Sequence, residues 1–422
     1  MRGKVVQVKI NDLAYAGQGL GISGGGQRVL VWGALPGETV TAQVGRVVTD
    51  KGFEALEATV MEVLEKSPHR IEPEEKHYII SSPWQIVTYE KELEYKELIG
   101  RKVFGEVADV GVGGLEVVDN GEVYGYRNSM DFNVIQDKNT LKLALLSRGR
   151  KRKIRIKGSK LAYPVIDEVA RDILKILNDS EKTFLAHVEP LPQYSREKFF
   201  QNKGLIEQLR IKIRANRNGE FVWGVFDKEG NKVLKQVQDD SKEYLEEKIL
   251  GKSLRTGVDN FFQINPSMFE KTVEKMKEFV QGDNIVDYFG GVGTISIALS
   301  DVIGSSVIVE NDSKCTKWAG ENIKLNKCEN IKVETARSEE ALEYINKDKI
   351  IILNPPREGV HESVIKRILE VSPKKIIYLS CKPFTQARDI KPLLWQYKIA
   401  HLELYNFFPR TPHIESLVVL EK

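Results

Sequence analysis

The feature that most constrains the fold is an alternation of short apolar runs and amphipathic stretches between residues 265 and 380. Asn265 and Pro266 form the cap and first-turn pair that begins a helix, and the apolar residues after them keep helical spacing. Five strand-like runs then alternate with helical segments: Asn284–Tyr288, Ser305–Val309, Ile331–Glu334, Lys349–Leu353 and Lys375–Leu379. This βαβ rhythm predicts an α/β fold with a doubly wound, Rossmann-like parallel sheet.

Residues 1–62 have a different pattern, in which polar and apolar residues alternate in short runs. The runs lie at Val5–Ile10, Gly24–Trp32, Glu38–Val48 and Ala55–Val63. Turn signals separate them, a glycine-rich stretch at residues 17–26 and Leu-Pro-Gly-Glu at residues 35–38. This pattern predicts a small OB-like β-barrel, a fold that binds oligonucleotides in many proteins and is a plain spacer in others.

The region between the barrel and the sheet is a mixture of helices and strands. A Ser-Pro linker at residues 67–68 precedes a charged helix expected from Tyr89 to about Lys102. Further strands are expected around Tyr126–Val134, Ile211–Ala215 and Gly219–Phe226, and a helix near Tyr163–Leu177. We therefore predict three domains: the barrel (1–62), a central α+β domain (63–255) and the sheet domain (256–422).

Composition narrows the class of protein. The 422 residues are 41% hydrophobic and 29% charged, as in globular domains. No run approaches the roughly 18 apolar residues of a membrane helix, and the N-terminus lacks the apolar core of a signal peptide, so we expect a cytoplasmic protein that binds no membrane. Three cysteines, Cys315, Cys328 and Cys381, do not have the number or spacing of a disulfide framework or a zinc site, and we expect no metal.

The net charge of +3 is too small to favour a polyanionic partner, but the charge is unevenly distributed. Between Leu145 and Tyr163 there are eight basic residues and no acidic residue: Arg148, Arg150, Lys151, Arg152, Lys153, Arg155, Lys157 and Lys160. Such a run is either a solvated face or a patch that contacts the phosphates of a nucleic acid.

The first strand of the sheet leads into a glycine-rich turn, Asp-Tyr-Phe-Gly-Gly-Val-Gly-Thr at residues 287–294. The second strand ends at Glu310, a carboxylate suited to accept both hydroxyls of a ribose. Because the turn lacks the Gly-x-Gly-x-x-Gly fingerprint of dinucleotide sites, we interpret the turn and Glu310 together as a site for S-adenosylmethionine. Asn354, followed by two prolines, ends the fourth strand at the edge where ligands of such sheets bind.

Cys381 follows the fifth strand and therefore lies at the same sheet edge. A lone cysteine is usually a small core residue, and we assign that role to Cys315 and Cys328. Cys381 differs because Lys382 and Arg388 are near enough in sequence to favour its thiolate. We therefore interpret Cys381 as a nucleophile.

A thiolate beside a methyl donor suggests methylation of carbon 5 of a uracil. That carbon becomes nucleophilic only after a nucleophile adds to carbon 6 of the ring. A base must later remove the proton from carbon 5, and Glu415 or His413, just before the last apolar strand, could supply it.

These residues resemble the RNA uracil-5-methyltransferase family, which makes 5-methyluridine in tRNA and 23S rRNA. The resemblance covers nearly the whole chain: the N-terminal TRAM domain, Tyr-Arg-Asn-Ser-Met at 126–130, Phe-Phe-Gln-Ile-Asn at 261–265, Asn-Pro-Pro-Arg at 354–357, Ser-Cys-Lys-Pro at 380–383, and Pro-x-Thr-x-His-Ile-Glu at 409–415. It implies Cys381 as nucleophile and Glu415 as the proton-abstracting base. It also places Gln263, Phe289, Thr294 and Glu310 around S-adenosylmethionine.

This sequence departs from the family at three places, of which one, Gly290 where cysteine is common, is a minor change. Many members bind a [4Fe–4S] cluster through four cysteines in the linker and central domain. Here no cysteine precedes residue 315, with Glu75 and Ser81 in that region, so we expect no iron–sulfur cluster. Asn354 stands where the family usually has aspartate, which keeps the shape and an acceptor oxygen but loses a charge.

Two other functions are compatible with parts of the sequence. Asn-Pro-Pro at 354–356 also resembles the motif of enzymes that methylate exocyclic amines, although Arg357 stands where that motif has an aromatic residue. A non-catalytic RNA-binding protein is the other alternative. Under the hypothesis of uracil methylation, we expect the RNA substrate to be 23S rRNA or tRNA, with 23S rRNA slightly favoured. We also expect the protein to be a monomer.

Overall fold

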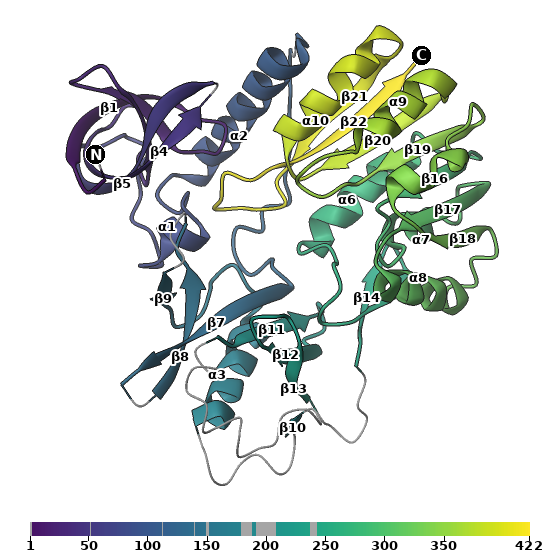
Figure 1. Ribbon diagram of the computed structural model, residues 1–422, viewed down its shortest axis with the longest axis horizontal. Coiled ribbons are helices and arrows are strands. Elements are labelled where there is room, and N and C mark those ends of the chain that lie inside the picture. The colour runs from purple at the N-terminus through teal and green to yellow at the C-terminus, as the bar shows by residue number, and fades with distance from the viewer. Residues whose placement is uncertain are drawn as a thin grey trace. The chain divides into compact units, whose positions relative to one another are not determined.

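The computed structural model describes residues 2–50, 52–111, 113–138, 140–148, 152–178, 188–190, 208–236 and 243–422 (Figure 1). These residues form two compact units. Unit 1 comprises Met1–Val123, Pro356–Gly359 and Tyr378–Leu420, and unit 2 comprises Tyr124–Pro355, Val360–Ile377 and Glu421–Lys422. The three-domain division made from the sequence stays a prediction.

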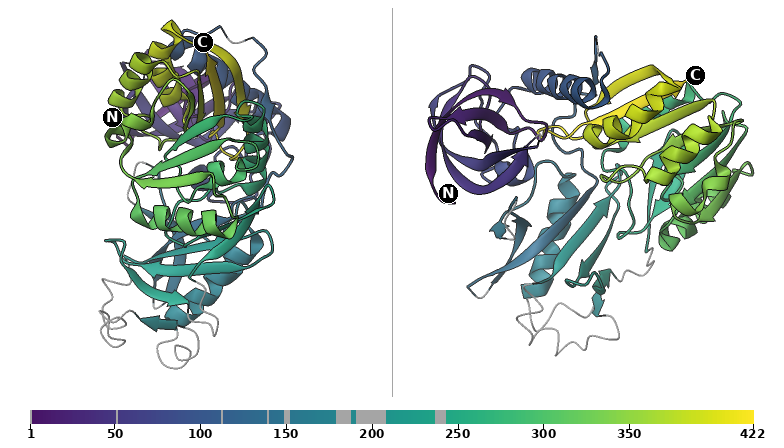
Figure 2. Two further views of the ribbon diagram at one scale, coloured as in Figure 1. Left: turned by 90° about the vertical axis from the view of Figure 1, so that its right-hand side faces the viewer. Right: turned by 45° about the horizontal axis from the view of Figure 1, so that its top comes forward.

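Unit 1 begins with the predicted barrel, drawn in purple in Figures 1 and 2. Five strands close it in the order β1-β2-β3-β5-β4: β1 (Val5–Leu13), β2 (Gly19–Ser23), β3 (Arg28–Trp32), β4 (Thr39–Asp50) and β5 (Phe53–Glu65). Alternate residues of the strands fill its core, among them Val8, Ile10, Val31, Val40 and Leu56. The closed barrel confirms the interpretation of the alternating pattern.

Strand β2 corrects one expectation, because residues 17–26 were interpreted as a turn. A Cβ on Gly21 would lie 2.1 Å from the Lys9 carbonyl oxygen, and one on Gly19 would lie 2.8 Å from Ile10 Cγ2. These glycines therefore allow β2 to pass close to β1, rather than forming a turn. The left-handed glycines Gly17 (φ 84°) and Gly26 (φ 78°) mark the real turns at either end.

The rest of unit 1 combines helices with the end of the large sheet. It contains α1 (Tyr78–Ser81), α2 (Tyr89–Val103), the π-helix η1 (Phe104–Ala108), β6 (Val117–Val118), α10 (Pro383–Ile390), the 3-10 helix η4 (Lys391–Trp395), β21 (Lys398–Tyr405) and β22 (Glu415–Glu421, of which Glu421 belongs to unit 2). Helix α2 confirms the charged helix. Strands β6 and β21, which pair in parallel, were not predicted, because β21 carries half-buried polar residues such as His401 and Glu403.

Unit 2 contains an antiparallel sheet in the order β10-β13-β12-β11-β7-β8-β9. The strands are β7 (Ser129–Asp137), β8 (Thr140–Leu146), β9 (Lys153–Arg155), β10 (Val188–Pro190), β11 (Arg210–Ala215), β12 (Phe221–Phe226) and β13 (Lys232–Gln236). Helix α3 (Pro164–Asn178) shares one core with the sheet, in which Ile166 and Ile173 lie with Phe132 and Ile211. The predicted helix near Tyr163–Leu177 and the two later strands are confirmed.

The parallel sheet follows the predicted βαβ rhythm. A separate hairpin of β14 (Leu245–Ile249) and β15 (Lys252–Thr256) precedes it in the chain. The elements that follow are α6 (Pro266–Lys277), β16 (Asn284–Tyr288), α7 (Thr294–Ala298), β17 (Ser305–Glu310), α8 (Ser313–Leu325), β18 (Ile331–Thr335), the 3-10 helices η2 (Ser338–Glu340) and η3 (Leu342–Tyr344), β19 (Lys349–Leu353), α9 (Glu362–Val371) and β20 (Lys375–Ser380, of which Tyr378–Ser380 belong to unit 1). As predicted, the Asn265 side chain caps α6 by accepting a hydrogen bond from Met268 N at 3.2 Å.

The strand order of this sheet is β18-β17-β16-β19-β20-β22-β21-β6. From β16 the chain moves outward through β17 to β18 and then returns to β19 on the other side of β16, with parallel pairing throughout. The order therefore reverses between β16 and β19, and ligands of doubly wound sheets bind at the carboxyl ends of such a strand pair. No helix in the described residues is long and apolar enough to cross a membrane.

Candidate active site

The carboxyl end of β16, in unit 2, carries the glycine-rich turn. Phe289 leaves the strand with φ 63°, and its backbone N–H donates to the Val309 carbonyl at 2.9 Å. A Cβ on Gly290 would lie 2.7 Å from Ile308 Cγ2, and Gly293 has φ 86° immediately before Thr294 begins α7. The chain can pass this close to β17 only with glycine at these positions, so the turn leaves a backbone-lined edge for a ligand.

Glu310 ends the neighbouring strand, and its carboxylate is held by backbone donors. Gly291 N donates to Oε2 at 3.0 Å, and Asp312 N donates to Oε1 at 2.9 Å. Each oxygen keeps a further lone pair, so the fixed carboxylate can accept two more hydrogen bonds from a vicinal diol.

Asp287, the buried residue that opens the turn, is a site feature that the sequence analysis did not single out. Ser296 donates to Asp287 Oδ2 from its hydroxyl at 2.8 Å and from its backbone N–H at 3.3 Å. Oδ1 has no hydrogen-bond partner among the described residues. Burial raises the pKa of this carboxyl to about 6. The signal available in the sequence was an acidic residue near the end of an apolar strand, just before a glycine-rich turn.

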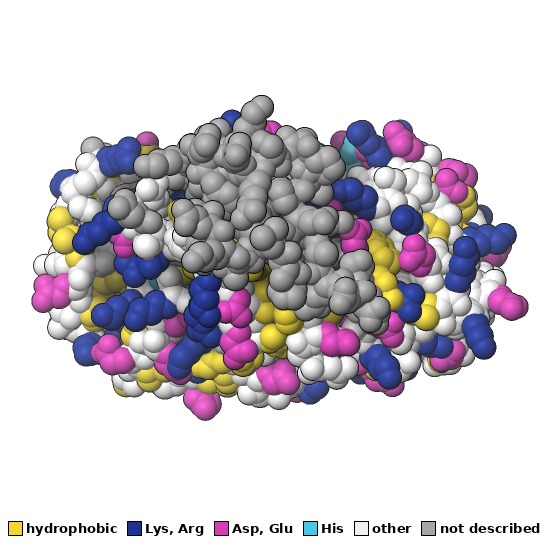
Figure 3. Space-filling view, turned by 90° about the horizontal axis from the view of Figure 1, so that it is seen from below, with side chains coloured by type: hydrophobic (Ala, Val, Ile, Leu, Met, Phe, Trp, Pro, Cys, Tyr) yellow, Lys and Arg dark blue, Asp and Glu magenta, His cyan; other side chains and the backbone are white. Residues whose placement is uncertain are grey.

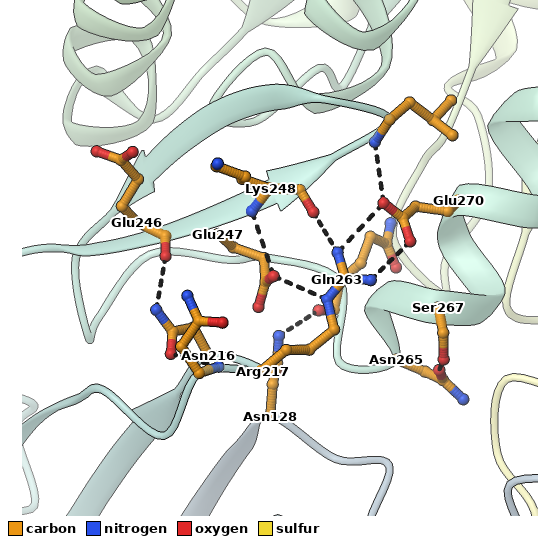
Figure 4. A network of polar contacts seen from close by, with 12 residues as sticks. Asn128, Asn216, Arg217, Glu246, Glu247, Lys248, Gln263, Asn265, Ser267 and Glu270 are labelled. Carbon is orange, nitrogen blue, oxygen red and sulfur yellow. Dashed lines mark hydrogen bonds and ion pairs between the residues drawn. The ribbon is translucent and has the colours of Figure 1, made fainter.

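Asn354 and Gln263 are the other residues predicted to contact a cofactor, and both lie in unit 2. Asn354 follows β19, and its backbone N–H donates to the Tyr288 carbonyl at 3.3 Å, so it lies at the switch point beside β16. Gln263 precedes α6, and its carbonyl accepts from Asn128 Nδ2 at 2.9 Å. Figure 4 shows this segment with Asn128, Gln263 and Asn265, next to the ion pair of Arg217 with Glu247 and Glu270.

A thiol, a carboxyl group and a guanidinium form the second group, which lies in unit 1. Half-buried Cys381 follows β20, and Glu415 begins β22 with 3% of its surface exposed. Burial first, and then the charge of Glu415, raises the pKa of the Cys381 thiol to about 11, while a hydrogen bond and the charge of Arg357 lower it. Burial raises the pKa of Glu415 to about 8, against the lowering effect of Arg357.

Arg357 is therefore a functional candidate that the sequence analysis missed. Among positive charges it has the largest effect on the thiol. The Arg388 guanidinium donates instead to Asp389 Oδ1 at 2.7–2.8 Å and to the Glu358 carbonyl at 2.8 Å. The Arg388 side chain is therefore engaged by other partners, because closeness in sequence does not fix where a long side chain points, while the expectation for Lys382 stays a prediction. The signal for Arg357 was its place directly after the two prolines of a stiff loop.

Gln386 holds the two strand ends that carry the thiol and the carboxyl group. Its Nε2 donates to the Tyr378 carbonyl at 2.7 Å and to the Ser416 carbonyl at 3.2 Å. Its Oε1 accepts from the Ser416 hydroxyl at 2.5 Å. One fully buried amide thus joins the residue next to Glu415 to β20, the strand that Cys381 follows.

A buried network fixes the loop that leads to Glu415. Arg410 N donates to Glu92 Oε1 at 2.8 Å, and Arg410 Nη1 donates to the Val87 carbonyl at 2.8 Å. Lys96 Nζ donates to Glu92 Oε1 at 2.9 Å, to Asn406 Oδ1 and to the Phe408 carbonyl at 3.1 Å. Because Lys96 and Glu92 are completely buried, their charges are compensated by each other and by these contacts.

The remaining titratable candidates are His413, Cys315 and Cys328. His413 packs edge-on against Phe408, with ring centroids 6.0 Å apart. Glu415 is the acid–base candidate beside the thiol, because its charge acts on Cys381. Cys315 is buried and accepts from Asn260 Nδ2 at 3.4 Å, and Cys328 is also buried, as expected for core cysteines.

The structure describes only part of the basic run, because Arg150 and Lys151 lie outside the described residues. Lys153 Nζ donates to the Val134 carbonyl at 2.7 Å, and Arg155 pairs with Asp137 at 2.7 Å. In the view of Figure 3, lysine and arginine side chains are interspersed with aspartate and glutamate. The phosphate-contacting interpretation of the run stays a prediction.

The residues present do not fit an iron–sulfur cluster. A [4Fe–4S] cluster needs four thiolates, and all three cysteines of the chain lie after residue 314. In the linker, Gln85 Nε2 donates to Glu75 Oε2 and to Ser82 Oγ, both at 2.7 Å. No group of three or more histidine, cysteine, aspartate or glutamate residues suited to a metal occurs in the described part of the chain.

The strand order, the glycine turn at the switch point and the appended barrel define an α/β methyltransferase with an OB-like domain. The chain belongs to the tRNA (uracil-5-)-methyltransferase family, whose model matches residues 88–422, and a TRAM domain model matches residues 1–50. It is thus an enzyme of the RNA (uracil-5-)-methyltransferase class. These findings confirm the resemblance and the fold class.

Relatives and a solved structure match over almost the full length. An uncharacterized RNA methyltransferase of Thermotoga maritima is 27% identical over 453 residues, covering 99% of both chains. Another, of Lactiplantibacillus plantarum, is 25% identical over 454 residues, covering 100% of this chain and 98% of the relative. The crystal structure of Pyrococcus abyssi tRNA (uracil-54, C5)-methyltransferase in complex with S-adenosyl-L-homocysteine is 23% identical, with a TM-score of 0.74, and the match covers 98% of this chain and 99% of that one.

Proposed function

We propose that the protein transfers a methyl group from S-adenosylmethionine to carbon 5 of a uridine in RNA, through a covalent adduct between Cys381 and carbon 6. The observation that supports the proposal is the group of Cys381, Glu415 and Arg357 in unit 1, in which the Arg357 side chain forms a hydrogen bond with the thiol and its charge acts on both the thiol and the carboxyl group. A nucleophile, a base and a cation are the protein groups that this chemistry requires.

The residues at the β16–β19 switch point fit S-adenosylmethionine. The Glu310 carboxylate would accept from the two ribose hydroxyls. Phe289, Thr294, Asn354 and Gln263 would line the same ligand. When bound, S-adenosylmethionine supplies an electrophilic methyl group on a sulfonium.

The chain's own residues account for the other steps. The Cys381 thiol would release its proton to solvent, helped by the charge of the Arg357 guanidinium, and the thiolate would add to carbon 6. The electron pair left at carbon 5 would take the methyl group that S-adenosylmethionine supplies, with S-adenosylhomocysteine as the leaving group. The ionised Glu415 carboxylate then accepts the carbon 5 proton. The electron pair of that C–H bond restores the C5–C6 double bond and expels the thiolate. Because its pKa is raised to about 8, the Glu415 carboxylate is a stronger base than that of an ordinary glutamate, and its ionised fraction grows as the pH rises toward 8.

The alternative of exocyclic amine methylation gives the thiol, the carboxyl group and Arg357 no role. It would leave turnover of Cys381→Ala nearly intact, whereas the proposed reaction requires the thiol.

The family name and the solved relative refer to tRNA, while the sequence alone slightly favoured 23S rRNA, and the chemistry is the same on both. The test is nucleoside mass spectrometry of tRNA and 23S rRNA from a strain lacking the protein. We expect 5-methyluridine to disappear from one of them and to return with the wild type but not with Cys381→Ala. Restoration by Cys381→Ala, or a product methylated on nitrogen, would contradict the proposal.

A further inference from the structure

The loop between β1 and β2 of the barrel lies against both chain segments that carry the reacting residues, all within unit 1. The Tyr15 ring in this loop packs on Phe384, with centroids 5.9 Å apart and the planes tilted by 46°. Phe384 is the third residue after Cys381. Gly17 packs on Pro412, three residues before Glu415, so closely that a Cβ would lie 2.1 Å from Pro412 Cβ.

The loop is held in this place by its own hydrogen bonds. The indole N–H of buried Trp84 donates to the Gly17 carbonyl at 3.0 Å, and Trp84 N donates to the Arg410 carbonyl at 3.1 Å. The Tyr15 hydroxyl donates to Glu106 in η1. The aromatic pair is therefore oriented before any ligand binds, which reduces the entropy lost on binding.

Phe384 nevertheless remains 41% exposed. It is the second residue of α10 and lies two residues after Lys382, which is also exposed. A large apolar side chain exposed beside a nucleophile has no structural purpose in the described contacts beyond its packing on Tyr15. Aromatic faces are the surfaces on which unpaired nucleobases stack, and a nearby lysine complements the phosphate.

We infer that Phe384, supported by Tyr15, is a stacking platform for the nucleobase next to the target uridine. This inference rests on the proposed function and deepens it. An enzyme that acts on the ring of a base must extrude that base from its stack, which leaves the adjacent base without a stacking neighbour. The Phe384 ring replaces that neighbour, so the barrel supports substrate binding at the reacting residues.

The experiment is a binding cycle without methyl donor. The probe is the stem–loop of tRNA or 23S rRNA that the wild-type protein binds most tightly. Two variants of this RNA carry one abasic nucleotide each, the first on the 5′ side and the second on the 3′ side of the target uridine. Phe384→Ala should weaken binding of the intact stem–loop by roughly 5- to 150-fold, the range for loss of one base–aromatic stack. One of the abasic RNAs should weaken wild-type binding similarly and should weaken Phe384→Ala little further.

Matched variants separate stacking from folding. Phe53→Ala removes an aromatic ring of the barrel that is 67% exposed and should leave binding unchanged. Phe384→Trp should retain binding, and Gly17→Ala should weaken it by displacing the loop that carries Tyr15. The inference would be overturned if Phe384→Ala bound the intact RNA as tightly as the wild type. It would also be overturned if each abasic nucleotide weakened binding of Phe384→Ala as much as it weakens binding of the wild type.

The binding cycle also separates this inference from the proposed function. Coupling between Phe384 and one flanking base without any 5-methyluridine formation would support the platform and contradict the proposed reaction. Formation of 5-methyluridine without such coupling would do the opposite.

Discussion

The edge of unit 2 that we propose binds the cofactor, at the ends of β16 and β17, differs in its construction from the proposed reacting group of Cys381, Glu415 and Arg357 in unit 1. At the edge, backbone geometry dominates: the glycine turn follows one strand, and two backbone N–H groups hold Glu310. The reacting group takes single side chains from three distant segments, and buried polar contacts such as those of Gln386 and Lys96 hold those segments. We therefore expect substitutions at the edge to act on ligand affinity, and substitutions around the reacting group to act on chemistry or on folding.

The largest expected effect is that of Glu415→Gln on turnover. Loss of a general base lowers the rate by roughly 10²–10⁴-fold. Because the amide cannot take the carbon 5 proton, the RNA adduct of Cys381 should accumulate on ordinary uridine. Single-turnover kinetics and denaturing gels measure both effects. The matched edge variant, Glu310→Gln, should mainly raise KM for S-adenosylmethionine, and the comparison fails if both variants change kcat alike.

The next largest effect is that of Lys96→Met on stability. The substitution leaves the Glu92 carboxylate buried without its partner, and breaking such a pair costs roughly 3–5 kcal/mol of unfolding free energy. The control Lys91→Met removes a more exposed ion pair with Glu94 and should cost less than about 1 kcal/mol. Urea unfolding of both variants gives the difference. Equal losses would show that the buried network does not hold the loop.

The raised pKa of Glu415 predicts a pH dependence of stability. The folded protein binds this proton up to about pH 8, whereas the unfolded chain releases it near its ordinary value of 4.5. The folded state therefore holds more protons between these values, so its stability falls as pH rises through this window, by on the order of 3 kcal/mol. Glu415→Gln should lack this component. Denaturant midpoints of both proteins at pH 5 and 8 test it, and parallel pH profiles would refute the assigned burial effect.

The smallest expected effect concerns the glycine turn. Gly290→Ala forces a methyl group to within 2.7 Å of Ile308 Cγ2, an overpacking that costs roughly 1–3 kcal/mol, and it should weaken binding of S-adenosylhomocysteine. Gly320→Ala lies on helix α8 with open space around it and should stabilise by roughly 0.5–1 kcal/mol. Titration calorimetry measures the affinity for S-adenosylhomocysteine, and scanning calorimetry measures the melting temperature of each variant. Unchanged affinity in Gly290→Ala would mean that the turn does not approach the ligand.

The same contrast explains which features the sequence could predict. The strands of the parallel sheet, the N-cap of α6 and the residues of the glycine turn follow from local periodicity and capping, which a single chain segment contains. The position of Cys381 at the sheet edge could also be predicted from the sequence, because the carboxyl end of a parallel strand has a known place in the fold. Strand β2 was missed because its glycines serve a close approach to β1 that only the folded barrel reveals.

Arg357 was missed for a related reason. The effect of its guanidinium on the Cys381 thiol depends on three segments that meet only after folding. The Lys96–Glu92–Arg410 network is likewise invisible in the sequence, because Lys96 and Glu92 look like an ordinary surface pair four residues apart on a charged helix.

The most direct test of the central claim is trapping with RNA that carries 5-fluorouridine at the target position. A base can remove a proton from carbon 5 but cannot remove fluorine in the same way. After methyl transfer, the bond between Cys381 and carbon 6 therefore cannot be broken by elimination. With S-adenosylmethionine, the wild type and the control Cys315→Ser should give a protein–RNA adduct that survives denaturation, and Cys381→Ser should give none. An adduct of undiminished yield in Cys381→Ser would contradict the account.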